Sequence, residues 1–128
     1  MHIEFFDDPL QQPRSRAEVR IKQIGLYVQE DLRRISFGLE LTPFLERPSI
    51  QVAILNGRGE PAGALSVIET MTPNFTLFIH LRDDEVADPY ELTAVIYYAT
   101  PDTDRLDVDQ QSVAFSASEP GERTYDFA

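Results

Sequence analysis

The sequence contains no cysteine and no tryptophan, and Lys22 is its single lysine among 128 residues. The absence of thiols excludes disulfides, thiolate catalysis and zinc–sulfur sites. The first residues lack a basic start followed by an apolar run, so they do not resemble a signal peptide. No apolar stretch approaches the roughly 20 residues that a helix needs to cross a bilayer. These absences predict a cytoplasmic protein.

The charge is strongly one-sided, with 22 acidic against 11 basic residues and a formal net charge of −11. Such a chain is repelled by phosphate backbones and anionic lipid, so neither nucleic acid nor a membrane surface is an expected partner. The 42% of hydrophobic residues nevertheless exceeds what a disordered acidic tail contains. The length and composition therefore predict one folded domain with a buried core.

From residue 33 onward the hydrophobic period is two, as in half-buried strands. Within 33–42, for example, Ile35, Phe37 and Leu39 alternate with small or polar residues. Proline- and glycine-containing connections separate the strands. The predicted strands are a segment within 17–32 and the segments 33–42, 49–56, 64–70, 74–81, 90–99 and 108–117. Seven strands of this spacing predict an all-β, antiparallel β-sandwich.

The segment 16–32 has two interpretations. Ile21, Ile24 and Val28 fit a helical stripe, which would make the fold α+β. The many β-branched and aromatic residues, with Gly25 among them, favour a strand instead. In the strand the alternation shifts by one residue near Gln23, as a β-bulge would cause. We expect an N-terminal arm over 1–16, the sandwich over 17–117 and a C-terminal extension over 118–128.

The sequence DEVADPYEL leads into the sixth predicted strand and places Tyr90 after a polar, proline-containing loop. This arrangement resembles the immunoglobulin and fibronectin type III β-sandwich domains, whose corner tyrosine at this position hydrogen-bonds to upstream backbone. The chain departs from these families in having no core tryptophan, Leu92 where an antibody domain has cysteine, and Val86 rather than aspartate four residues before the tyrosine. The resemblance implies an immunoglobulin-like fold and no particular activity.

Two acidic loops, 83–88 and 102–107, flank the predicted strand 90–99. A ten-residue strand spans about 33 Å, so the two loops lie at opposite ends of the sandwich and cannot share one ion. At the first end, Asp83, Asp84, Asp88 and Asp31 are candidate calcium ligands, because calcium takes six to eight hard oxygen atoms. The second loop lacks the glycine and the distal glutamate of an EF-hand.

Candidate catalytic residues are few. His2 lies in the expected arm, His80 lies on a strand, and no nucleophile-elbow, zinc-protease, phosphate-loop or dinucleotide motif occurs. We therefore expect a non-enzymatic module for protein interaction or assembly, without a cofactor. Its partner is an unidentified protein, or a second copy paired through an edge strand. The alternative is a calcium-dependent module that binds a ligand or carbohydrate with the loop end 82–89.

Overall fold

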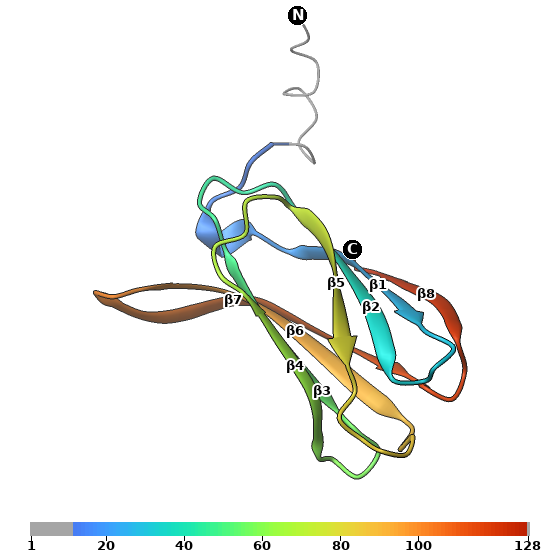
Figure 1. Cartoon of the computed structure of the whole chain (residues 1–128). Helices are drawn as coiled ribbons and strands as arrows, with labels where there is room; N and C mark the ends of the chain where they lie inside the picture. The colour runs from blue at the N-terminus through green and yellow to red at the C-terminus, as the bar shows by residue number, and fades with distance from the viewer. Residues whose placement is uncertain (1–11, 128) are drawn as a thin grey trace, which may run out of the picture.

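The computed structural model describes residues 12–127 and shows two four-stranded antiparallel sheets packed face to face (Figure 1). One sheet contains β5 (Asn74–His80), β2 (Arg34–Leu41), β1 (Ile21–Val28) and β8 (Gly121–Asp126), in that order. The other contains β4 (Pro61–Val67), β3 (Ser49–Leu55), β6 (Tyr90–Thr100) and β7 (Thr103–Phe115), in that order. The predicted all-β sandwich is confirmed, but the predicted number of seven strands is wrong, because the described residues form eight.

The additional strand, β8, lies within the predicted C-terminal extension 118–128. It pairs with β1 from Gln23 opposite Asp126 to Val28 opposite Gly121. Its six residues alternate strictly between half-buried and exposed positions. Arg123 and Tyr125 occupy half-buried positions where a core strand usually carries aliphatic residues. This polar pattern explains why hydrophobic periodicity did not reveal the strand.

The ambiguous segment forms strand β1, and the helix alternative is wrong. The register between β1 and β2 shifts between Ile21 and Gln23, where the sequence predicts a bulge. Within the described part of this segment, helical geometry is limited to the short 3₁₀ turn Arg16–Glu18. The predicted N-terminal arm lies mostly outside the described residues, but Arg14 forms an isolated bridge with Phe44.

The core lies between the two sheets and consists of the inward side chains of both. In β2 the fully buried positions Ile35 and Phe37 alternate with partly exposed residues, as the period of two predicts. Ile96 of β6 and Ile24 of β1 are likewise fully buried. Burial of each such side chain contributes roughly 1.5–3 kcal/mol.

Strands β6 and β7 form a long hairpin that projects beyond the sandwich (Figure 1). The sequence predicts a loop at 102–107, whereas β7 begins at Thr103. This part of β7 was not predicted because Thr103, Asp104, Arg105 and Asp107 supply no apolar face. No helix among the described residues is long and apolar enough to span a membrane.

Candidate functional site

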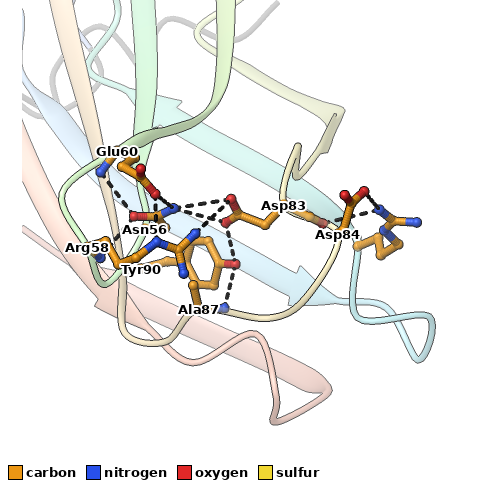
Figure 2. Close-up of polar contacts among 8 residues, drawn as sticks. Asn56, Arg58, Glu60, Asp83, Asp84, Ala87 and Tyr90 are labelled. Atoms are coloured by element: carbon orange, nitrogen blue, oxygen red, sulfur yellow. Dashed lines mark hydrogen bonds and ion pairs between the residues drawn. The ribbon is translucent and has the colours of Figure 1, made fainter.

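The first acidic loop is held to the fold by a polar network around Asp83 (Figure 2). The Asp83 carboxylate accepts a hydrogen bond of 2.8 Å from the Tyr90 hydroxyl and one of 3.1 Å from the Asn56 amide. The Arg58 guanidinium lies 3.7 Å from the same carboxylate. The Tyr90 hydroxyl also accepts from the backbone N–H of Ala87 at 3.0 Å, so the predicted bond to upstream backbone is confirmed. Burial raises the pKa of Tyr90.

Asn56 connects this network to the β3–β4 turn. Its side-chain oxygen accepts from the backbone N–H groups of Arg58 and Glu60, at 2.9 and 3.0 Å. An Asx turn of this kind fixes a tight connection. The hydrogen bond from Arg58 lowers the pKa of the Glu60 carboxyl. The carboxylates of Asp83 and Glu60 therefore stabilise the turn and the loop around Tyr90.

Asp31, another predicted calcium ligand, accepts hydrogen bonds from the turn in which it lies. Its carboxylate accepts from the backbone N–H groups of Arg33 and Arg34, at 2.9 and 3.0 Å. These bonds lower the pKa of Asp31 to about 2. Asp84 is fully exposed and lies 3.5 Å from the Arg33 guanidinium.

Asp88 binds the β7–β8 connection on another side of the loop. It accepts from the backbone N–H of Ala117 at 2.6 Å and from the Ser118 hydroxyl. The structure thus places Asp83 and Asp84 in one loop but directs the predicted ligands to different donors. Over residues 12–127 there is no group of three or more histidine, aspartate or glutamate side chains that could hold a metal ion.

The second acidic segment has a different environment. All nine residues of 99–107 are exposed, although they form a hydrogen-bonded hairpin. We call residues 99–107 the ribbon. Tyr98, immediately before it, is 5% exposed and donates a hydrogen bond of 2.9 Å to the Glu46 carbonyl. The buried positions of β6 therefore end at Tyr98, and the ribbon follows them.

The two faces of the ribbon differ in character. On one face the Arg105 guanidinium lies 4.0 Å from the centre of the Tyr97 ring and 2.6 Å from the Asp107 carboxylate. Arg105 also donates to the Gln51 side chain at 2.6 Å. On the other face Leu106 is 47% exposed. The ribbon thus presents an ordered charged face and an uncovered apolar side chain.

The outer edge of β7 is covered where it crosses the sandwich. Arg20 donates to the Val108 carbonyl at 3.3 Å, and the Tyr125 hydroxyl donates to the Ala114 carbonyl at 3.0 Å. The Asp109 carboxylate accepts from the backbone N–H of Ile21 at 2.8 Å. Among the described residues, no other strand pairs with β7 except β6. All three of these contacts lie outside the ribbon, between residues 108 and 114.

Other residues singled out by the sequence have ordinary surroundings. His80 is exposed at the end of β5, and His2 lies outside the described residues. Glu69 follows β4 rather than lying within a strand, and its backbone adopts φ of 47°. Tyr97 and Tyr98 point to opposite faces as predicted, with Tyr98 in the packed interior. In the sequence, the ribbon is marked only by its closely spaced aspartates at positions 102, 104 and 107.

Comparison with known proteins supports the fold. The chain matches no protein-family model, and no curated protein matches it in sequence. A solved structure of Bifidobacterium dentium β-glucuronidase, complexed with coumarin-3-O-glucuronide, is similar in fold, with a TM-score of 0.52 and 17% sequence identity. The match covers 78% of this chain but 18% of the glucuronidase chain. At this identity the likeness shows a shared β-sandwich fold alone.

Proposed function

We propose that the chain is a non-enzymatic protein-interaction module whose ribbon pairs with an extended strand of a protein partner. The observation that carries the proposal is that residues 99–107 are all exposed, although they belong to a hydrogen-bonded hairpin. A two-stranded hairpin in water is marginally stable by itself, since it buries little apolar surface. The ribbon contributes no side chain to the described core, so selection for stability does not explain its length.

Strand pairing fits the geometry of the ribbon. The last β3 residue paired with β6 is Ser49, opposite Tyr97, so the β6 side of the ribbon also extends past its neighbour. Unpaired N–H and C=O groups on such edges bind extended segments by β-augmentation. Proteins usually cover these edges, as Arg20 and Tyr125 do farther along β7. The contrast within one strand favours the ribbon as the binding edge.

The contacts of the acidic residues at the loop end 82–89 support the proposal that the module is not an enzyme. Asp83, Asp31 and Asp88 bind donors of the fold itself, which gives each a structural role. The corner bond of Tyr90 to Ala87 supports the finer likeness to immunoglobulin-type sandwiches. With its net charge of −11, the module is proposed to act in the cytoplasm on protein rather than on nucleic acid or membrane.

The test is a variant in which residues 99–107 are replaced by Asn-Gly, a sequence that favours a tight hairpin turn. We expect an unchanged thermal unfolding midpoint, within a few degrees, and loss of partner binding in cross-linking and co-purification. The matched control replaces the exposed residues Ile68 and Met71 by serine, which removes apolar surface elsewhere and leaves the ribbon intact. Binding that persists in the shortened variant and disappears in the control would contradict the proposal.

A further inference from the structure

We infer that the partner strand is β7 of a second copy of this chain, paired antiparallel about a twofold axis at Leu106. This inference rests on the proposed function, because it assigns a partner to the same edge. The edge lies on the exposed ribbon, which projects from the body and leaves room for a second molecule (Figure 1). A self-complementary patch is what a twofold dimer interface requires.

The charge pattern around Leu106 is self-complementary. In an antiparallel pair centred on Leu106, Arg105 stands opposite Asp107 of the partner subunit, and Asp107 stands opposite the partner's Arg105. The axis then brings Leu106 against the partner's Leu106. Opposite charges and apolar side chains directly across a strand pair are favourable. In each subunit the arginine and the aspartate lie on either side of the leucine, so a twofold axis at the leucine pairs each arginine with an aspartate.

Neighbouring alignments are unfavourable for the same reason. A twofold axis at Arg105 would oppose two arginines, and one at Asp107 would oppose two aspartates. Like charges directly across a strand pair are destabilising. The alignment at Leu106 avoids both contacts. The sequence Arg105–Leu106–Asp107 therefore specifies the register of the pair as well as its partner.

The three side chains are available for this contact. The side chains of Arg105 and Asp107 are 40% and 56% exposed, and Leu106 is 47% exposed as a residue. Stacking on Tyr97 holds the Arg105 guanidinium in place before a partner binds, which reduces the entropy lost on association. The pairing ends near Val108, where Arg20 occupies the carbonyl. The expected pairs are therefore those of residues 104–108.

A strand pair of this length is a small interface, at the low end of the sizes found for specific complexes. We therefore expect a dimer that dissociates on dilution. A cross-link can detect such a dimer and report its register. The chain contains no native cysteine, so a single introduced cysteine reacts without background.

The first test compares Leu106→Cys with Asp104→Cys under mild oxidation. At the axis the two Cα atoms lie about 4.5–5.5 Å apart, within the range that a disulfide bridges. Residue 104 lies opposite residue 108 of the partner, so two cysteines at 104 are offset by four residues, roughly 14 Å along the strand. We expect disulfide-linked dimer from Leu106→Cys at least tenfold faster than from Asp104→Cys. Equal rates for the two variants would overturn the proposed register.

The second test uses charge reversal and analytical ultracentrifugation. Arg105→Asp and Asp107→Arg should each abolish dimerisation, because each places like charges across the axis. The double variant Arg105→Asp/Asp107→Arg restores opposite charges and should dimerise again. Loss of the dimer in the double variant would contradict the charge pairing. Circular dichroism of all three variants reports whether the sandwich is intact.

The same experiments separate this inference from the proposed function. A wild-type chain that stays monomeric at millimolar concentration, with binding of another protein that requires the ribbon, would overturn the second copy as partner and leave the interaction function standing. Dimerisation and protein binding that both survive replacement of residues 99–107 would overturn both.

Discussion

Tyr90→Phe tests whether the corner network stabilises the sandwich. The substitution removes the hydroxyl alone, and with it the bond donated to Asp83 at 2.8 Å and the bond accepted from Ala87 at 3.0 Å. The aromatic ring is retained, together with its stacked contact to Phe115 at 5.6 Å between ring centres. Any loss of stability therefore reports on the two hydrogen bonds.

The expected magnitude follows from the partners. A hydrogen bond to a charged group contributes about 1.5–3 kcal/mol, and a neutral one contributes about 1 kcal/mol. Asp83 keeps its bond from Asn56, whereas the N–H of Ala87 loses the hydroxyl that accepts from it. We expect a decrease of about 2–4 kcal/mol in the free energy of unfolding. For a domain of this size about 1 kcal/mol corresponds to roughly 4 °C, so the unfolding midpoint should fall by roughly 8–16 °C.

The assay is urea unfolding followed by circular dichroism, with Tyr98→Phe as the matched control. Tyr98 is also buried, but its hydroxyl makes a single hydrogen bond, to the neutral carbonyl of Glu46. The control should therefore lose about 1 kcal/mol. Equal losses in the two variants, or a loss below about 1 kcal/mol for Tyr90→Phe, would refute the role assigned to Asp83 as the charged acceptor.

Three further predictions concern the loops around the sandwich. The pKa of Asp31 is lowered to about 2, so its carboxylate stabilises the fold fully above the ordinary pKa of about 3.9, and this contribution disappears as the pH falls toward 2. Titration of the side-chain carbonyl followed by NMR should give a pKa near 2. The free energies of unfolding of the wild type and of Asp31→Asn should become equal as the pH approaches 2. Millimolar calcium should leave the melting temperature unchanged relative to chelator, whereas binding at 100 times the dissociation constant would add about 2.7 kcal/mol. Gly57→Ala should destabilise the fold by about 1–3 kcal/mol in urea unfolding, because its Cβ would overlap the carbonyl oxygen of Asp88 and lie 2.8 Å from that of Ala87. In the control Gly25→Ala, no atom beyond the adjacent residues lies within 4 Å of the added Cβ, so this variant should be neutral or stabilising.

The fold class could be predicted because the core strands carry a binary pattern. The alternation around Phe37 and the phase shift near Gln23 come directly from the spacing of apolar residues, and both match the structure. The strand β8 did not follow this pattern. Its inward positions include Arg123, whose guanidinium donates to the carbonyls of Ser116 and Glu119. The strand is held by its pairing with β1 and by these side-chain hydrogen bonds, so its inward positions show no hydrophobic period.

The candidate site was harder to predict, because a group of acidic residues in the sequence can either bind an ion together or accept hydrogen bonds from separate parts of the fold. The sequence grouped Asp31, Asp83, Asp84 and Asp88 by the end of the sandwich at which their loops lie. It could not show that Asp31 and Asp88 accept from backbone N–H groups of different turns. Nor could it show that β7 begins at Thr103, because strand pairing with β6, rather than an apolar face, determines that boundary.

The two acidic segments differ in what their charged side chains contact. Around Asp83, the carboxylates accept hydrogen bonds from the turns and strands next to them, so changing them should mainly alter stability. In the ribbon, Arg105 and Asp107 remain substantially exposed even though they pair with each other. Because surface ion pairs add little to stability, changing these two residues should leave the unfolding midpoint nearly constant. If the sandwich carries a projecting binding edge, substitution of Asp83 should lower stability, and substitution of Arg105 should weaken association without lowering stability.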